Sequence, residues 1–307
     1  MCRCPDDLAA SAQDGALTRS PKTIGEWRRE ISVRLRPISG DLASQEANQL
    51  VGEVAGGGPT ELTLRHLEQL GADQAARLDD LVAQRLTGRP LAYVVGHVEF
   101  HGVDILCDER ALIPRPETEE LVELALRTLP SPSPGVHPLV IDVGTGSGNI
   151  ALALAHQRPD LRLIATDVSA TALALARTNC ARLSLEDRVQ FLEGRTLSLF
   201  RPGLEVDMIV SNPPYIAPGD PNLERSVNEH EPEIALFAGP AGTEIIAELI
   251  RDSLPILRPD GSLVCEIGYG QAGEIRQMVA EIPGWSPPEF HRDLAGIERI
   301  LVLRPKS

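Results

Sequence analysis

The sequence is short of positive charge and contains no long apolar run. Its 307 residues include 29 Lys and Arg against 44 Asp and Glu, which gives a formal net charge of −15. A protein that binds nucleic acid through its phosphates needs a basic surface, so this balance argues against a direct nucleic-acid partner. No segment approaches the roughly 20 apolar residues that a membrane span requires. We therefore expect neither a nucleic acid nor a membrane as partner.

Cysteine is also scarce. The five cysteines are Cys2, Cys4, Cys107, Cys180 and Cys265. An odd and scattered set makes no disulfide framework, and no C-x-x-C pair offers the spacing of a metal site. The polar segment 1–21 lacks the basic and apolar parts of a secretory signal. We expect it to be a disordered leader on a soluble, cytoplasmic, monomeric protein without a metal.

Hydrophobic residues make up 42% of the chain, enough for packed cores, and the length suggests two domains. Residues 22–90 predict a small helical bundle, with helices over about 23–36, 41–55 and 72–86. Its first helix has a capping box at Thr23 and Glu26. That helix also carries four arginines, which form either a solvated face or a docking patch: Arg28, Arg29, Arg34 and Arg36.

Residues 91–113 have a different residue pattern, with short runs typical of β-strands at 93–95 and 103–106. They predict a β-hairpin linker between two domains. After an expected helix at 117–129 and a proline-rich loop, apolar strands and helices alternate over 114–307. Strands are expected at 139–143, 161–166, 189–192, 206–210, 262–267 and 300–303, and helices at 150–156, 170–183, 242–257 and 272–282. This alternation predicts an α/β domain with a doubly wound, mainly parallel sheet.

A glycine-rich loop follows the first of these strands. It runs through Asp142, Gly144, Thr145, Gly146, Ser147 and Gly148. Asp167 ends the next strand and can accept hydrogen bonds from both ribose hydroxyls of a nucleoside. NAD, FAD and S-adenosyl-L-methionine all suit such a pair. The G-x-G-x-G spacing and the acid at Asp142 favour S-adenosyl-L-methionine, because that cofactor has no pyrophosphate and carries a cationic methionine end.

The strand at 206–210 leads into the tetrapeptide Asn212-Pro213-Pro214-Tyr215. Two prolines stiffen this loop and remove two N–H groups, which leaves carbonyl oxygens free to accept. The side-chain oxygen of Asn212 and the carbonyl of Pro213 could hold an –NH2 group by its two hydrogens, with Tyr215 against its flat face. Such a grip suits methyl transfer to a planar amino or amide nitrogen.

With both motifs in hand, the chain resembles the HemK/PrmC family. The resemblance extends over about 88–302 and includes the segments 88–102, 112–119, 231–236, 266–271 and 293–299. It implies a class I, Rossmann-like methyltransferase fold that uses S-adenosyl-L-methionine to methylate N5 of a glutamine. That glutamine lies in the Gly-Gly-Gln loop of peptide chain release factors, and the helical domain would help to hold this large partner.

The resemblance also assigns roles to residues. It places cofactor contacts on residues 144–148, Asp167 and Asn212, and substrate contacts on Asn212, Pro213, Pro214 and Tyr215. Asn212, Pro213 and Tyr215 are thus the candidate catalytic residues. Residues 114–119 would line the site, although Glu117 and Glu119 could equally be an acidic first turn of a helix. One departure is Arg195, which stands where the family has an aspartate near the adenine; Glu193 is the possible substitute.

Two other functions remain open from the sequence. An N6-adenine DNA or RNA methyltransferase would use the same grip on an exocyclic amine. However, residues 205–248 around the tetrapeptide carry nine carboxylates and one Arg or Lys, Arg225, which would repel phosphates. A cofactor-binding scaffold without catalysis is the second alternative, and only Arg195 supports it.

Overall fold

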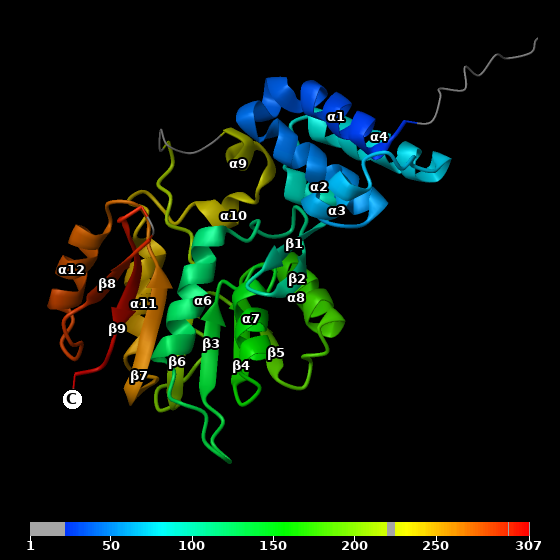
Figure 1. Ribbon diagram of the computed structural model, residues 1–307. Helices are drawn as coiled ribbons and strands as arrows, with labels where there is room; N and C mark the ends of the chain where they lie inside the picture. The colour runs from blue at the N-terminus through cyan, green and yellow to red at the C-terminus, as the bar shows by residue number, and fades with distance from the viewer. Residues whose placement is uncertain (1–21, 220–224, 294, 307) are drawn as a thin grey trace, which may run out of the picture. The chain divides into compact units, whose positions relative to one another are not determined.

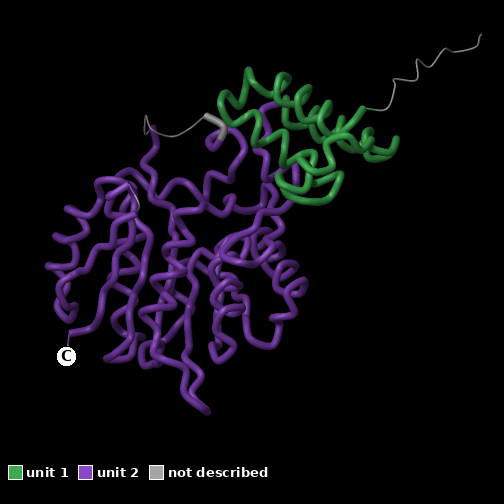
Figure 2. Tube along the Cα trace, in the orientation of Figure 1, with its two compact units in different colours: residues 1–86 green, residues 87–307 purple. Residues whose placement is uncertain are grey.

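The computed structural model describes residues 22–219, 225–293 and 295–306, which form two compact units (Figure 2). The first unit ends at Leu86 and the second begins at Thr87. The predicted leader, residues 1–21, lies outside the described residues. The hairpin that was expected to link two domains belongs to the second unit, so its role as a linker stays a prediction.

The first unit is the expected helical bundle. Its helices are α1 (Ile24–Ser39), α2 (Ala43–Ala55), α3 (Pro59–Leu64) and α4 (Ala72–Leu86), with a 3-10 turn η1 (Gly40–Leu42). The predicted capping box is present, because the Thr23 hydroxyl accepts from Glu26 N–H and Glu26 accepts from Thr23 N–H. Ile24, Trp27, Ile31 and Leu35 are buried at helical spacing along one face of α1.

The arginines of α1 divide into two pairs. Arg28 donates to Asn48 and Thr63, and Arg34 contacts Asp79 at 3.5 Å, all within the bundle. Arg29 and Arg36 are exposed. Half of the predicted arginine face therefore stabilises the bundle itself.

The second unit is built on a seven-stranded sheet in the order β5-β4-β3-β6-β7-β9-β8 (Figure 1). The strands are β3 (Leu139–Val143), β4 (Arg162–Asp167), β5 (Val189–Glu193), β6 (Val206–Ser211), β7 (Leu257–Glu266), β8 (Glu289–Arg292) and β9 (Glu298–Leu303). The first five in this sheet order pair in parallel, whereas β9 is antiparallel to both β7 and β8. The doubly wound, mainly parallel sheet is confirmed.

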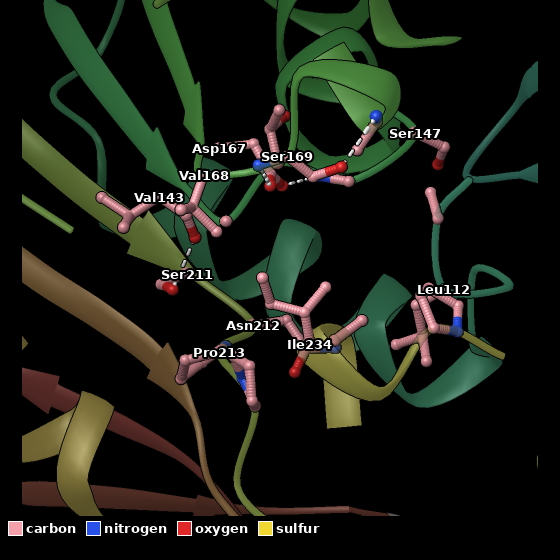
Figure 3. Close-up of a pocket in the computed structure, with 18 of the residues that line it drawn as sticks. Leu112, Val143, Ser147, Asp167, Val168, Ser169, Ser211, Asn212, Pro213 and Ile234 are labelled. Carbon is pink, nitrogen blue, oxygen red and sulfur yellow. Dashed lines mark hydrogen bonds between the residues drawn. The ribbon is translucent and has the colours of Figure 1, made fainter. Parts of the chain in front are cut away.

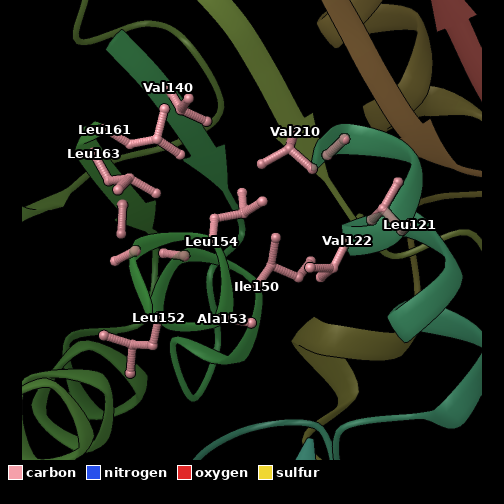
Figure 4. Close-up of a cluster of buried hydrophobic side chains, with 14 of the residues drawn as sticks. Leu121, Val122, Val140, Ile150, Leu152, Ala153, Leu154, Leu161, Leu163 and Val210 are labelled. Carbon is pink, nitrogen blue, oxygen red and sulfur yellow. The ribbon is translucent and has the colours of Figure 1, made fainter. Parts of the chain in front are cut away.

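Helices cover both faces of the sheet, and the strand residues alternate between them. Val140 of β3 packs with α6 (Pro116–Thr128), α7 (Asn149–Gln157), α8 (Ala170–Arg182) and the hairpin (Figure 4). Its neighbour Ile141 packs on the other face with α11 (Glu244–Ser253) and α12 (Ala272–Glu281). Met208 and Ile209 of β6 divide in the same way. Burial on both faces explains why these strands read as continuous apolar runs.

The predicted strand at 93–95 is wrong. These residues lie in α5 (Leu91–Val95), a short helix that ends at Gly96 in the left-handed conformation (φ 88°). The hairpin follows it, with β1 (His97–Phe100) paired to β2 (Val103–Leu106). The helix begins after Pro90 and ends at Gly96, so Val94 and Val95 do not form a strand although both are β-branched.

Smaller differences concern the last third of the chain. The predicted helix at 242–257 is shorter, because Pro255 cannot continue α11. The sequence reading missed α3, α9 (Arg225–His230), α10 (Glu233–Leu236) and the edge strand β8, all of which are short. Among the described residues, no helix combines the length and apolar character needed to cross a bilayer.

Candidate functional site

The parallel strands bring the two predicted motifs to one edge of the sheet. β3, β4, β6 and β7 all point the same way, so their carboxyl ends meet there. The glycine loop follows β3, Asp167 ends β4 and Asn212 follows β6. The Ser211 hydroxyl donates to the carbonyl oxygen of Val143 at 2.7 Å, which holds the start of the Asn-Pro-Pro-Tyr segment beside the glycine loop (Figure 3).

Two glycines of the loop are needed for different reasons. Gly144 has a φ of 72° and a Cβ placed there would meet open space at the pocket wall. Gly148 has a φ of 85°, and a Cβ would lie 3.0 Å from Leu152 Cδ1 and 3.2 Å from Ala176 Cβ. Gly148 thus allows α7 and α8 to pack closely, whereas Gly144 leaves room for a ligand.

Asp142 lies beneath the loop rather than in the pocket wall. It is fully buried, and its Oδ2 accepts from the Thr145 hydroxyl at 2.6 Å and from Ala151 N–H at 3.2 Å. Burial raises the pKa of Asp142 to about 7. The contacts observed for Asp142 therefore brace the loop, and its predicted contact with a cofactor stays a prediction.

A pocket opens above the loop and Asp167 (Figure 3). Six residues that the sequence assigned to a cofactor line it: Gly144, Thr145, Gly146, Ser147, Asp167 and Asn212. Asp167 Oδ2 accepts from Gly146 N–H at 2.9 Å and its Oδ1 from Ser169 N–H at 2.8 Å. Each carboxylate oxygen keeps a second lone pair for a ligand hydroxyl. Burial raises the pKa of Asp167.

A second pocket lies on the other side of the tetrapeptide. Asn212, Pro213 and Pro214 line both pockets, and Tyr215 lines the second. The tetrapeptide is therefore the wall at which two ligands could meet. Within the described residues, no donor is bonded to the Pro213 carbonyl oxygen or to Asn212 Oδ1, so neither acceptor has a protein partner.

Three residues that were not assigned a catalytic or binding role contact Asn212 and Tyr215: Thr118, which lies in the predicted lining segment 114–119, Glu266 and Gln271. Asn212 Nδ2 donates to Thr118 Oγ1 at 2.9 Å, and Thr118 Oγ1 donates to Glu266 Oε2 at 2.9 Å. The Tyr215 hydroxyl lies 3.3 Å from Glu266 Oε1, and its backbone oxygen accepts from Gln271 Nε2 at 3.0 Å. All three residues lie in segments that the family resemblance marked, but no chemical pattern in the sequence pointed to them individually.

The segment that precedes α6, which contains Ile113 and Arg115, is held in place by Glu231. The buried Glu231 carboxylate accepts from Ile113 N–H at 3.1 Å and from the Arg115 guanidinium. Arg115 lines both pockets, Glu117 lines the second and Glu119 lines neither. Glu117 is thus the one of the two predicted carboxylates that faces the site.

Arg195 lines the first pocket, where an aspartate was expected. Its guanidinium donates to Glu248 Oε1 at 2.7 Å, and the side chain is 60% exposed. Glu193 is not among the residues that line this pocket. The structure therefore gives no support to Glu193 as a substitute for the missing acid.

Comparison with known proteins places the chain in a family. Residues 26–96 match the family model "PrmC N-terminal domain", and residues 121–227 match "Methyltransferase small domain". A release factor glutamine methyltransferase of Bradyrhizobium diazoefficiens is 36% identical over 92% of this chain and 95% of its own. One of Koribacter versatilis is 41% identical over 77% of this chain and 82% of its own. The chain belongs to the release factor glutamine methyltransferase family.

A solved structure supports the fold independently. The hMettl16 catalytic domain in complex with a 3'UTR hairpin superposes with a TM-score of 0.51, covering 76% of this chain and 81% of that one. Its sequence identity is 17%, so this likeness bears on the fold alone.

Membership of this methyltransferase family implies S-adenosyl-L-methionine as cofactor, and the first pocket fits it. The Ser147 hydroxyl oxygen is buried at the pocket without a partner among the described residues. Asp167 offers a carboxylate to ribose hydroxyls, and the apolar Val168 and Ile234 line the same pocket. A buried polar atom without a partner is costly, so a polar ligand there is favoured.

Proposed function

We propose that the chain transfers a methyl group from S-adenosyl-L-methionine to N5 of the glutamine in the Gly-Gly-Gln loop of peptide chain release factors. The observation that carries this proposal is that Asn212, Pro213 and Pro214 form a wall shared by two pockets. The names of the curated relatives agree with it, since they are release factor glutamine methyltransferases.

The open acceptors of the wall suit an amide as the attacking group. A glutamine –NH2 can donate one hydrogen to Asn212 Oδ1 and the other to the Pro213 carbonyl oxygen. These bonds fix the nitrogen in the plane of the two acceptors and turn its lone pair toward the first pocket. They also strengthen as the nitrogen gains positive charge, which stabilises the transition state more than the ground state.

The cofactor supplies a methyl group on a positively charged sulfur. Transfer would form a carbon–nitrogen bond as the carbon–sulfur bond breaks, which would leave a neutral thioether, and one of the two amide protons would pass to solvent. The aromatic ring of Tyr215 provides a flat surface in the second pocket for the glutamine side chain. No covalent bond to the enzyme is required at any stage.

The other assignments follow from the substrate. Residues 26–96, which match the PrmC N-terminal domain, are inferred to help hold the release factor beyond its glutamine. Because release factors act on ribosomes, we infer that the enzyme works in the cytoplasm. We infer that it acts as a monomer.

The test uses labelled S-adenosyl-L-methionine and three substrates in parallel: a purified release factor, its Gly-Gly-Gln glutamine-to-alanine variant, and duplex DNA. We expect label on the wild-type factor alone. The enzyme variant Asn212→Ala should bind the cofactor within a few-fold of wild type but lose at least a hundredfold in kcat. Label on DNA would instead indicate an adenine methyltransferase, and cofactor binding without any transfer would indicate a scaffold.

A further inference from the structure

A chain of hydrogen bonds runs from the tetrapeptide into the core of the second unit. It links Asn212 to Thr118 of α6, and Thr118 to Glu266 at the end of β7. Thr118 and Glu266 are 1% and 3% exposed, so water does not compete for these groups. A second bond ties Glu266 to the Tyr215 hydroxyl. One buried carboxylate is thus linked directly to Tyr215 and, through Thr118, to Asn212.

The donors and acceptors of this chain can be arranged in only one way while Glu266 is ionised. A carboxylate only accepts, so the single hydrogen of the Thr118 hydroxyl must point to Glu266. Thr118 Oγ1 can then only accept from Asn212, and the amide must turn its Nδ2 toward Thr118. Asn212 Oδ1 is left facing the pockets, in the orientation that accepts a substrate N–H.

A proton on Glu266 would remove this constraint. A protonated Glu266 can donate to Thr118, whose own hydrogen is then free to point to Asn212. The Asn212 amide could satisfy that donor only by rotating, which would present Nδ2 instead of Oδ1 to the substrate. In that second arrangement two N–H groups would face each other and the bond to Asn212 would be lost, so protonation lowers the fraction of enzyme that can hold the amide.

We propose that Glu266 is a positioning residue that sets the side-chain orientation of Asn212 through Thr118, so that methyl transfer is faster with Glu266 in its ionised form. This inference rests on the proposed function, because it concerns the grip on the substrate amide. Glu266 does not touch the reacting nitrogen in this scheme. It acts on the acceptor that does.

The surroundings of Glu266 raise its pKa into the range over which kcat can be measured. Burial raises the pKa of Glu266 to about 7, and the negative charge of Glu117 on α6 adds to this rise. The hydrogen bonds from Thr118 and Tyr215 and the positive charge of Arg299 on β9 act in the opposite direction. The pKa of Tyr215 is itself raised, mainly by burial, so Tyr215 keeps its hydrogen and remains a donor to Glu266.

The experiment measures kcat against pH for full-length enzyme with a release factor as substrate. We expect wild-type kcat to fall on the acid side with a midpoint near pH 7. Glu266→Gln should lower kcat at least tenfold at pH 8 and lose this acid limb, since a neutral amide can both donate and accept and no longer orders the chain. Cofactor affinity, measured by calorimetry, should stay within twofold and show that the fold is intact.

Five further variants separate a positioning role from a general loss of structure. Thr118→Val should lower kcat as Glu266→Gln does, whereas Thr118→Ser should keep kcat near that of wild type. The double variant Thr118→Val/Glu266→Gln should have a kcat no lower than that of either single variant, because both substitutions act through one path. Glu117→Gln should keep the acid limb but move it to lower pH. Glu119→Gln is the matched control on the same helical turn, and its profile should overlay wild type.

A readout without turnover completes the test. In the full-length chain, the NMR signals of the Asn212 side-chain –NH2, identified by their loss in Asn212→Asp, should shift with pH in step with the Glu266 carboxylate. They should not titrate in Glu266→Gln. If wild type methylates the factor but Glu266→Gln keeps both kcat and the acid limb, the inference is overturned while the proposed function stands. If wild type methylates nothing, the proposed function fails and the NMR titration decides the positioning role alone.

Discussion

The Asn179 side chain donates to the carbonyl oxygen of Ser147 at 2.9 Å and thereby joins α8 to the glycine loop. The same side chain also pairs with the backbone of Leu106 in β2, donating at 3.1 Å and accepting at 2.8 Å. Asn179 is fully buried. One amide thus ties the hairpin, the helix and the loop together, which explains why the hairpin belongs to the second unit.

We predict that Asn179→Ala lowers the free energy of unfolding by about 1–3 kcal/mol, because three buried backbone contacts lose their partner. It should also weaken cofactor binding, since the Ser147 backbone is no longer held. Urea denaturation and calorimetry measure the two effects. Thr178→Ala is the control: Thr178 is the preceding, exposed residue, and its hydroxyl bonds only within its own helix. A loss of unfolding free energy equal to that of the control would contradict the role of Asn179.

The buried Asp142 predicts a pH-dependent stability. Because burial raises the pKa of Asp142 from 3.8 to about 7, the folded protein keeps a proton that the unfolded chain releases. Stability conferred by this site is therefore present below about pH 4 and is lost as the pH rises from there to about 7. The slope for one proton is about 1.4 kcal/mol per pH unit at most.

Asp142→Asn removes this titration while keeping the acceptor for Thr145 and Ala151. We expect the variant to resemble wild type near pH 4 and to become the more stable of the two as the pH approaches 7. Urea midpoints of both proteins across this range, without cofactor, give the difference. Other buried acids such as Glu266 are common to both proteins and cancel. A constant difference over the range would show that Asp142 is already ionised in the folded protein.

Gly144 and Gly148 offer a matched comparison within one loop. Both have positive φ, so alanine at either should cost about 1–2 kcal/mol in strain. Gly148→Ala should cost more, because its Cβ would also press on Leu152 and Ala176. Gly144→Ala should be the milder change for stability but the worse one for cofactor affinity, since its Cβ enters the pocket. Equal effects of both variants on unfolding and on binding would refute this division.

The parts of the fold that depend on a pattern within a short stretch of sequence could be predicted. The parallel strands are apolar on both faces, and the capping box and glycine loop are local patterns, so each was visible without tertiary contacts. Tyr93 was misassigned because Pro90 and Gly96, which flank the five residues of α5, decide its conformation. Its buried hydroxyl donates to Ala111 O at 2.8 Å, a contact that no local pattern reveals.

The site shows the same limit. The residues predicted to bind the cofactor and the substrate lie in two short motifs, and their proposed chemistry was inferred from those motifs alone. Thr118 and Glu266 are 148 residues apart, and each is an ordinary residue in its local context. Only the packing of α6 against the end of β7 brings them together, so their effect on Asn212 could not be read before the fold was known.

Arg195 provides the last prediction, because it puts a positive charge on the wall of a pocket for a positively charged cofactor. Arg195→Asp removes that charge and offers an acceptor to the adenine amine, so we expect it to tighten S-adenosyl-L-methionine binding about tenfold, or ~1.4 kcal/mol. Arg195→Ala removes the charge without adding an acceptor and should change the Kd less than threefold. The loss of the exposed pair with Glu248 should cost under about 1 kcal/mol of stability in both variants.

S-adenosyl-L-homocysteine separates charge from hydrogen bonding, since it has the same adenine but no sulfonium charge. If the acceptor dominates, Arg195→Asp should tighten both ligands by similar factors. If charge dominates, the gain should be larger for S-adenosyl-L-methionine, and Arg195→Ala should show part of it. Weaker binding of both ligands to Arg195→Asp than to wild type would mean that Arg195 itself contributes to binding, and that the pair with Glu248 holds its guanidinium in place for that purpose.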